Sequence, residues 1–252
     1  MARALFKSWF VDFDPVRAKA EGRDTGLPPE IAALFPDSFE ESELGEVPTG
    51  WAIGKLDDIV AVNPTRSLRK GDVAPYLDMA NMPEEGHVPD DVIDRPFGSG
   101  MKFANGDTLV ARITPCLENG KTAFVDFLEQ DQIAWGSTEY VVLRSKVPLP
   151  LEFSYLLARS DQFREFAIQS MTGSSGRQRV SPDMLRRFAM AIPSKVVAEA
   201  FGEVAHRLLA QCRSNSRVAR TLAELRDKLL PRLVSGDLGV MDIGRLPEGS
   251  VP

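Results

Sequence analysis

The stretch KVVAEAFGEVAHRLLAQCRSNSRVARTLAELRDKLLPRLVSG, residues 195–236, has the clearest periodicity in the chain. Its apolar residues recur in alternating steps of four and three, which predicts a long helix with a coiled-coil seam. Pro231, with Gly236 beyond it, is expected to end this helix. The seam consists of Val197, Phe201, Val204, Leu208, Gln211, Asn215, Val218, Leu222, Leu225 and Leu229.

A seam of this length favours a helix that pairs with another helix. About 33 residues at a rise of 1.5 Å span roughly 50 Å, which exceeds the width of a small domain. Gln211 and Asn215 form a polar layer near the midpoint, and such a layer can fix register or orientation at a cost in stability. The alternative is an amphipathic helix that lies on the domain's own core.

The residues before this helix show a change of period from strands to helices. Short runs rich in Val, Ile, Phe and Tyr predict strands over 108–113, 121–127 and 139–143, with a hairpin turn at Asn119-Gly120. Helices are expected over 153–158 and 163–171. Ser181-Pro182-Asp183 is a typical helix start, and Met190–Ile192 predicts a last short strand. The pattern is that of a mixed α+β domain.

The N-terminal fifty residues differ in texture from the strand-rich body. Leu5, Phe6, Trp9 and Phe10 lie on one face of a short predicted helix, which must pack against something to be stable. From Pro15 to about Gly50, four further prolines and an excess of acids favour an extended linker. At most one helical turn is expected there, around Ile31–Leu34.

Composition limits the classes of function. The 252 residues have a net charge of −6, but residues 1–150 carry −10 and the remainder +4. This asymmetry is a hint about partners, although uneven solvated faces would give the same arithmetic. No apolar stretch is long enough to span a membrane, and two cysteines make no disulfide framework. We therefore expect a cytoplasmic protein without a membrane partner.

Chemistry-bearing motifs are missing or incomplete. His87, His206, Cys116 and Cys212 are too few and too scattered for a zinc site or a His-based triad. The glycines do not match a G-x-G-x-x-G cofactor loop, and Gly120-Lys121-Thr122 lacks the first glycine of a phosphate-binding loop. The sequence thus favours a binding protein without catalysis, cofactor or metal of its own.

Two basic segments are candidates for DNA contact. The loop Thr172–Arg179 lies in a gap without acids, and its glycines would let the backbone approach a ligand closely. Asn63–Lys70 is a basic run in an acidic stretch, and its side chains would mostly bind phosphates. Ordinary solvated loops are the alternative for both. The predicted DNA-binding residues are Thr172, Gly173, Ser174, Ser175, Arg177, Gln178, Arg179, Asn63, Arg66, Arg69 and Lys70, with Arg112 and Lys121 as further candidates.

Several segments together resemble the DNA-specificity subunit of type I restriction–modification systems. Val47–Trp51 resembles the entry into a target-recognition domain, and Phe103–Leu109 is similar to the family's Gly-Asp-x-Leu segment. Thr172-Gly173 with Arg177, Val180 and Ser181 resembles a Gly-rich turn into a helix. Leu225–Gly236 resembles the end of the family's long spacer helix, and Leu5–Pro15 resembles the end of a preceding one.

The resemblance implies a half-length subunit with one recognition domain and one complete spacer helix. Full subunits carry two of each, with the two helices antiparallel. We therefore expect a homodimer through an antiparallel coiled coil, which would hold two recognition domains roughly 50 Å apart on a bipartite palindromic site. The other possible partner for the seam is the methyltransferase. The expected parts are 1–46, a short helix and Pro-rich linker; 47–194, a recognition domain with a curved mixed sheet; 195–236, the long helix; and 237–252, a tail.

The family also implies a function. The chain would read one half-site in double-stranded DNA for a complex whose other subunits methylate adenine or translocate and cleave DNA. S-adenosylmethionine, ATP and Mg²⁺ would belong to those methyltransferase and restriction/translocase subunits. The alternative is an assembly factor, a degenerate half-subunit that no longer reads DNA, which the acidic balance of residues 1–150 favours modestly.

Overall fold

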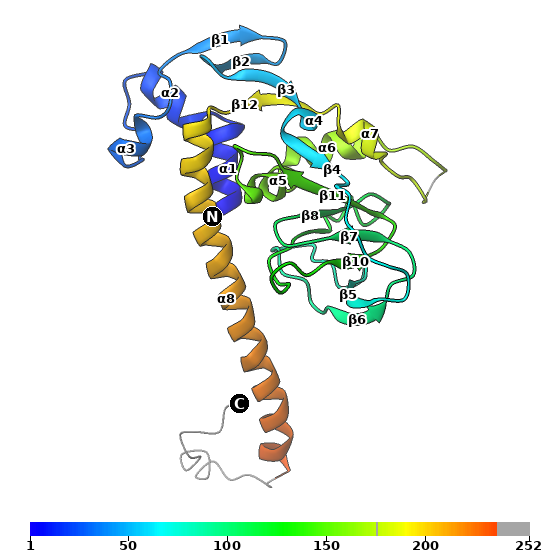
Figure 1. Cartoon of the computed structure of the whole chain (residues 1–252). Coiled ribbons are helices and arrows are strands. Elements are labelled where there is room, and N and C mark those ends of the chain that lie inside the picture. Colours follow the sequence, from blue (N-terminus) through cyan, green and yellow to red (C-terminus); the bar gives the residue numbers. More distant parts are fainter. Residues whose placement is uncertain (175, 236–252) are drawn as a thin grey trace. The chain divides into compact units, whose positions relative to one another are not determined.

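The computed structural model of the chain describes residues 1–174 and 176–235 (Figure 1). The chain forms two compact units, Met1–Leu209 and Ala210–Pro252. Ser175 and the expected C-terminal tail, 237–252, lie outside the described residues. The first unit contains all the strands described below and the second contains the later part of one long helix.

The N-terminal segment is folded, contrary to the extended linker expected from its prolines. It contains α1 (Ala2–Phe10), α2 (Asp14–Ala20), α3 (Pro29–Ala32) and a hairpin of β1 (Phe39–Ser42) with β2 (Gly45–Pro48). The prolines lie where they do not break elements: Pro15 and Pro29 each occupy the first turn of a helix, where a proline lacks only an N–H that would be unpaired anyway. The linker prediction is therefore wrong.

Strands form two four-stranded sheets and a two-stranded pair. The pair consists of β3 (Ala52–Lys55) and β12 (Ala189–Ile192), which are antiparallel neighbours although they lie far apart in the sequence of the first unit. One sheet has the order β4 (Val60–Val62), β11 (Tyr140–Ser145), β8 (Thr108–Ala111), β9 (Thr122–Phe124) and is antiparallel. The other has the order β6 (Ile93–Pro96), β5 (Val73–Leu77), β10 (Ala134–Gly136), β7 (Met101–Phe103), with the β5–β10 pair parallel. The mixed α+β class is confirmed.

The connection between β8 and β9 is longer than the sequence suggested. Asn119-Gly120 does not form a two-residue hairpin turn, because β8 ends at Ala111 and β9 begins at Thr122. Gly120 has a φ of 75°, a left-handed conformation that glycine adopts without strain, and closes a turn in which its N–H donates to the Leu117 carbonyl. A long loop in the first unit therefore occupies residues 112–121.

Helices lie between the strands in sequence, namely α4 (Leu56–Ile59), α5 (Leu151–Ala158), α6 (Asp161–Gln169) and α7 (Pro182–Leu185). Of these, α5 packs on the antiparallel sheet, and the sequence predicted helices at the positions of α5, α6 and α7 but not of α4. The expected start of α7 is confirmed, since the Ser181 hydroxyl accepts a hydrogen bond from the backbone of Met184. Phe153 of α5, fully buried, contacts the ring of Phe6 of α1 in an edge-on geometry. The N-terminal helix thus belongs to the core of the first unit.

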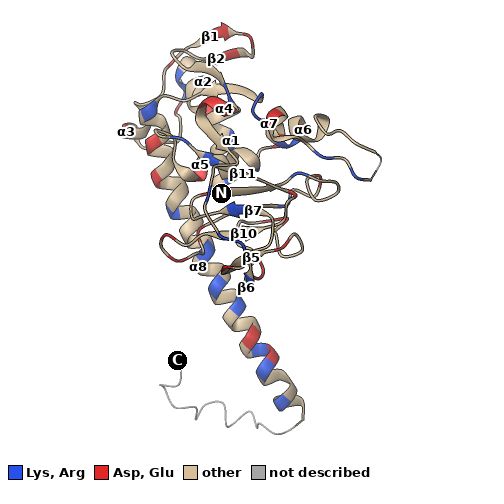
Figure 2. Ribbon diagram, turned by 45° about the vertical axis from the view of Figure 1, so that its right-hand side comes forward, with Lys and Arg blue, Asp and Glu red and all other residues tan. Residues whose placement is uncertain are grey.

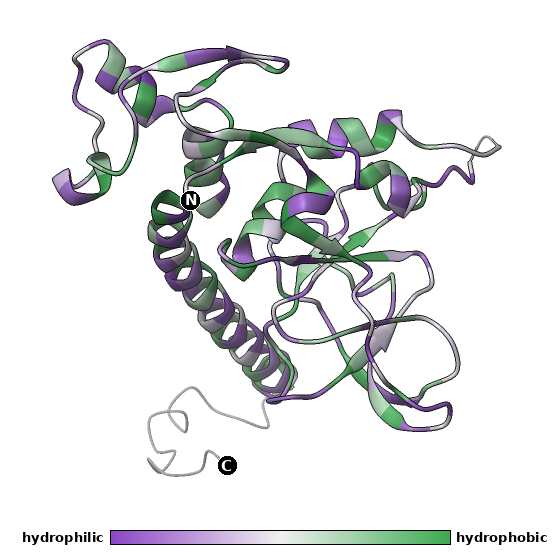
Figure 3. Cartoon of the chain, turned by 45° about the horizontal axis from the view of Figure 1, so that its top comes forward, coloured by the Kyte–Doolittle hydropathy of each residue, from purple (hydrophilic) through white to green (hydrophobic). Residues whose placement is uncertain are grey.

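The long helix α8 (Lys195–Val234) contains 40 residues and mixes hydrophobic with hydrophilic side chains along its length (Figure 3). Its first turns pack inside the first unit, where Phe201 contacts Phe6, Trp9 and Phe10. The sequence predicted that Pro231 ends the helix, but Pro231 lies inside its last turn. A proline removes only one donor, and the Pro231 carbonyl still accepts a hydrogen bond from Ser235. No helix in the described part of the chain is long and apolar enough to cross a membrane.

Candidate nucleic-acid interface

The loop from Thr172 to Arg179, here called the arginine loop, closes on itself through the backbone. Thr172 and Arg179 exchange two N–H···O bonds of 3.0 and 2.9 Å, and Arg179 also bridges to Ile113. Gly173 has a φ of 127°, which L side chains rarely adopt, so the turn after Thr172 requires a glycine. Thr172, Gly173 and Ser174 are exposed, and Ser175 lies outside the described residues.

The two arginines of this loop have different surroundings. Arg179 makes a two-pronged ion pair with Glu139, whose carboxylate accepts from Nη2 at 2.7 Å and from Nε at 2.9 Å. Arg112 donates to the same carboxylate at 3.2 Å. The hydrogen bond from Arg179 lowers the pKa of Glu139 below its ordinary value, and Glu139 in turn raises the pKa of Arg179. Arg177 is exposed and presents its side chain to solvent.

Arg179 braces the loop against the rest of the first unit, whereas Arg177 faces solvent. Glu139 holds Arg112 and Arg179 together at the root of the loop. Gln178 contributes its backbone to the same root, because it exchanges hydrogen bonds with Thr114. Direct DNA contact by any of these side chains stays a prediction.

The basic run Asn63–Lys70 also contains both residues with partners inside the first unit and exposed residues. The Asn63 side-chain oxygen accepts the Val142 N–H at 2.9 Å, so this residue extends the antiparallel sheet. Arg66 binds Asp107 through Nη2 at 2.6 and 2.7 Å and through Nε at 3.1 Å. The Asp107 side chain is fully buried and also accepts from Arg144 at 2.8 Å. Arg66 therefore has a structural partner that its position in a basic run did not indicate.

Of three other predicted residues, two are exposed and the third binds backbone carbonyls. Arg69 and Lys70 are exposed. The Lys121 ammonium instead donates to the backbone carbonyls of Met79 and Ala80, at 2.8 and 3.2 Å. Lys121 thus ties the loop before β9 to the loop after β5.

Sequence reasoning missed the acids and arginines that organise this region. Asp107 is part of the Gly-Asp-x-Leu segment, but its role as the shared partner of two arginines was not foreseen. Glu139 was treated only as a strand residue. Arg159, only 6% exposed, was not singled out, although its guanidinium donates to five backbone carbonyls, those of Pro83, Glu84, Gly86, Gly120 and Thr122.

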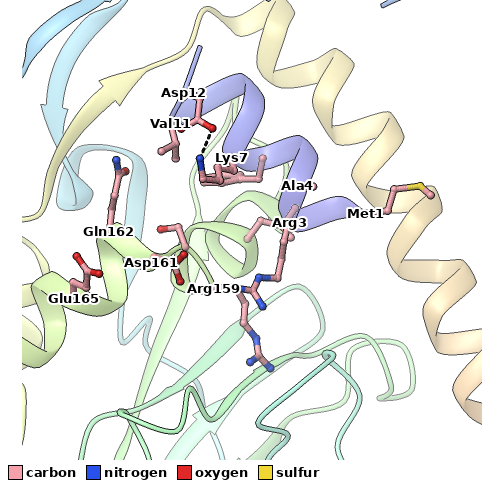
Figure 4. A pocket seen from close by; sticks show the side chains of 13 residues that line it. Met1, Arg3, Ala4, Lys7, Val11, Asp12, Arg159, Asp161, Gln162 and Glu165 are labelled. Atoms are coloured by element: carbon pink, nitrogen blue, oxygen red, sulfur yellow. Dashed lines mark hydrogen bonds and ion pairs between the residues drawn. The ribbon is translucent and has the colours of Figure 1, made fainter. Parts of the chain in front are cut away.

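A cavity of about 680 Å³ lies between α1 and the start of α6, away from the arginine loop (Figure 4). Lys7 and Asp12 on its rim form an ion pair, and Asp161 pairs with Arg164. Arg159 reaches the cavity wall but its guanidinium is bound to the carbonyls named above. Among the residues that the structure describes, no three His, Cys, Asp or Glu gather as metal ligands.

The predicted seam is divided between the two units. Val197 and Phe201 are fully buried in the core of the first unit, so their assignment to an intermolecular seam is corrected. Val204 and Leu208 are half-buried there. In the second unit Val218, Leu222 and Leu225 are 56%, 60% and 48% exposed, and Leu229 is half-buried. The Gln211 side chain donates to Asn215 at 2.8 Å within the helix.

Comparison with known proteins identifies relatives of this chain. The specificity subunit of the type I restriction enzyme HindI from Haemophilus influenzae is 24% identical over 288 residues, which cover 94% of this chain and 61% of that protein. The EcoAI specificity subunit from Escherichia coli is 30% identical over 164 residues, covering 58% of this chain and 26% of that protein. The chain is thus similar to type I restriction enzyme specificity subunits over almost its whole length.

The fold agrees with this relationship to the type I specificity subunits. The crystal structure of the HsdS subunit from Thermoanaerobacter tengcongensis superposes with a TM-score of 0.53 at 19% identity, covering 84% of this chain and 54% of that one. The chain therefore spans about half to three fifths of the length of the relatives that it matches most fully. No family model matches it.

Proposed function

We propose that this chain is a non-catalytic DNA-recognition subunit that reads one half-site of a type I restriction–modification target. Its similarity to specificity subunits along 94% of its length supports this role. We further propose that it acts in the cytoplasm and directs adenine methyltransferase and translocase–endonuclease subunits. S-adenosylmethionine, ATP and Mg²⁺ would be held by those partners.

The observation that carries the proposal is the geometry of the arginine loop. The Glu139 carboxylate binds Arg179 and Arg112 and so fixes the root of the loop. Arg177, two residues before the brace, is exposed. A fixed loop root with an outward arginine suits recognition of base edges or phosphates, because the root of the loop keeps its position while the exposed guanidinium reaches DNA.

Fluorescence anisotropy with a random-sequence duplex tests this proposal at low and at high salt. The wild-type chain should bind at low salt and lose affinity steeply as salt rises, through counterion release. Arg177→Ala should weaken binding to the random-sequence duplex if the side chain contacts phosphate, and by about 1–3 kcal/mol on a duplex that carries the target site if it reads a base. Arg23→Ala is the matched control, since Arg23 is exposed and pairs with Glu21 away from the loop. Equal affinities for Arg177→Ala and wild type at physiological salt would remove the loop from the interface.

The second candidate is an assembly factor that does not read DNA. The net charge of −10 over residues 1–150 favours it, because acidic surface repels phosphate. Absence of duplex binding at low salt, even with the methyltransferase subunit present, would support this candidate and end the DNA-reading proposal.

We also propose that the chain forms an antiparallel homodimer through the second unit. The exposed apolar side chains of Val218, Leu222 and Leu225 lie three and four residues apart and so share one helix face. Burying a large apolar side chain is worth about 1.5–3 kcal/mol, which favours a partner for this face. The methyltransferase is the other possible partner. Light scattering separates them: a particle near 27.8 kDa at micromolar concentration excludes the homodimer.

A further inference from the structure

The sheet of β6, β5, β10 and β7 has one face in the core and one face outside. Leu77, Phe103 and Ala134 are fully buried in the second hydrophobic cluster of the first unit. Their neighbours in sequence point the opposite way, since side chains alternate along a strand. Register places Tyr76 beside Ile93 and Trp135, and Trp135 beside Lys102. We call Tyr76, Ile93, Arg95, Lys102 and Trp135 the outer face; its strands lie together at one end of the first unit (Figure 1).

Aromatic rings on this face carry two cations. The Tyr76 and Trp135 rings are 4.4 Å apart, and the Phe97 ring meets Trp135 edge-on at 5.4 Å. The Arg95 guanidinium lies 4.7 Å from the centre of the Tyr76 ring, and the Lys102 ammonium lies 4.8 Å from the centre of the Phe97 ring. Figure 2 shows basic colouring on β7. The rings fix the position of each cation by a cation–π contact.

A ring positions a cation without neutralising it, whereas a carboxylate does both. Arg66, Arg112 and Arg179 all have carboxylate partners. Within residues 1–174 and 176–235, neither Arg95 nor Lys102 forms an ion pair. Asp94 follows Ile93 in β6 and so alternates to the opposite side of the sheet. The outer face therefore keeps its positive charge available.

The outer face continues into the exposed part of the basic run. The Gly71 N–H donates to the Phe97 carbonyl and the Phe97 N–H donates to the Asp72 carbonyl, both at 2.8 Å. The Asp72 carboxylate accepts the Arg69 N–H at 2.9 Å and is therefore directed at the backbone of the turn. These bonds hold Arg69 and Lys70 next to Phe97, on which Lys102 rests. The turn and the sheet thus present four cations from segments far apart in sequence.

We propose that this surface, formed by Arg95 and Lys102 on their aromatic supports together with Arg69 and Lys70, binds the phosphate backbone of duplex DNA. The inference rests on the proposed DNA-reading function and assigns to this surface the positioning contacts. Charge complementarity selects the partner, because cations without carboxylate partners match the regular negative charge of a duplex. The surface sets the position of the chain on DNA, and the arginine loop carries the sequence readout.

The test compares the salt dependence of binding of two double variants in the full-length chain. The probe is a random-sequence duplex. Arg95→Gln with Lys102→Gln removes two cations from the surface. Lys195→Gln with Arg207→Gln is the matched control, since these exposed residues pair with Glu199 and Glu203 on α8. Each lost phosphate contact lowers the slope of log K against log salt by about 0.9, so the first variant should lose about 1.8. The control should keep the wild-type slope.

The outcomes separate the two proposals. The inference alone is overturned if the wild-type chain binds DNA and the slope of Arg95→Gln with Lys102→Gln equals that of the wild type or of the control variant. A wild-type chain that does not bind duplex overturns the proposed function and this inference with it. A loss that differs between two duplexes of unrelated sequence would also overturn it, because phosphate contacts weaken binding uniformly.

A measurement on the wild-type chain guards against a variant that fails to fold. Acetylation of Lys102 should be slowed by bound duplex, whereas acetylation of Lys195, 67% exposed on α8, should not. Equal rates for Lys102 with and without duplex, under conditions where anisotropy shows binding, would exclude contact at this surface.

Discussion

Replacement of Asp107 by asparagine tests the electrostatic centre of the first unit. The fully buried carboxylate accepts from Arg66, from Arg144 and from the Ala104 N–H at 2.8 Å. Asparagine keeps the shape but replaces one oxygen by a donor, which then faces the donors of an arginine. Removing one partner of a buried ion pair costs about 3–5 kcal/mol. Since Arg66 and Arg144 are 18% and 32% exposed and regain some hydration, we expect about 3 kcal/mol.

Thermal unfolding followed by near-UV circular dichroism measures this loss. At about 2–4 °C per kcal/mol for a domain of this size, Asp107→Asn should lower Tm by about 6–12 °C. Asp57→Asn is the control, because Asp57 is half exposed and pairs with Arg186 at the surface, where a pair is worth about 1 kcal/mol or less. In the Asp107→Asn background, Arg66→Gln should cost less than in the wild type. If Asp107→Asn shifts Tm no more than Asp57→Asn does, Asp107 is not an electrostatic centre.

Three further predictions concern the arginine loop and the helix. Glu139 has a lowered pKa in the folded chain, mainly through its hydrogen bond from Arg179, so its stabilisation is complete above the unfolded pKa and disappears as pH falls through the folded value. The difference in Tm between wild type and Glu139→Gln should therefore be complete at pH 7, begin to shrink near the ordinary Glu pKa of about 4.3, and vanish only below the lowered pKa of the folded chain; a constant difference contradicts the ion pair. Arg179→Ala should lower Tm, whereas Arg177→Ala should leave it unchanged; equal Tm values for the two variants would refute the division of roles. On the proposed homodimer, Leu222→Lys should lower the mass in light scattering from twice 27.8 kDa to 27.8 kDa, and a variant that keeps twice 27.8 kDa would place the dimer contact elsewhere.

Local patterns predicted some of the elements of the first unit. The strand over Glu139–Leu143, the helices on either side of Ser160 and the start of α7 all depend on residues adjacent in sequence. The prediction of an N-terminal linker was wrong because proline can either interrupt a helix or occupy its first turn. Pro15 and Pro29 begin helices, and only the neighbouring apolar residues, such as Val16 buried in the core, distinguish that use from a break.

The candidate interface was less accessible to sequence reasoning because partners lie far apart along the chain. Arg66 and Asp107 are separated by 41 residues, and Arg179 and Glu139 by 40. A basic run and a basic loop are visible in sequence, but whether a given arginine faces solvent or a carboxylate depends on sheet register. The cations of the outer face were not singled out either, since Arg95 and Lys102 are isolated in sequence: Arg95 meets the Tyr76 ring across two strands, and Lys102 of β7 meets the Phe97 ring in the loop after β6.

The seam shows how one periodicity can serve two structural purposes. Val197 and Phe201 repeat on the same face as Leu222 and Leu225, yet the first two are core residues of the first unit and the last two are exposed in the second. A heptad pattern reports that a face is apolar and not which molecule covers it. The alternative of a helix on the domain's own core therefore applies to the first turns of α8.

Arg159 has a consequence for how the loops around it can change. Its guanidinium holds the segments Pro83–Gly86 and Gly120–Thr122 through main-chain oxygens alone. Every amino acid supplies that oxygen, so this attachment imposes no demand on the side chains of either segment. The two loops can accept new side chains while their backbones stay anchored to α5. Replacing the exposed side chains of Glu84, Glu85 and Asn119 would thus alter the surface chemistry and remove the Asn119–Glu84 hydrogen bond, while the contacts from Arg159 to the backbone stay in place.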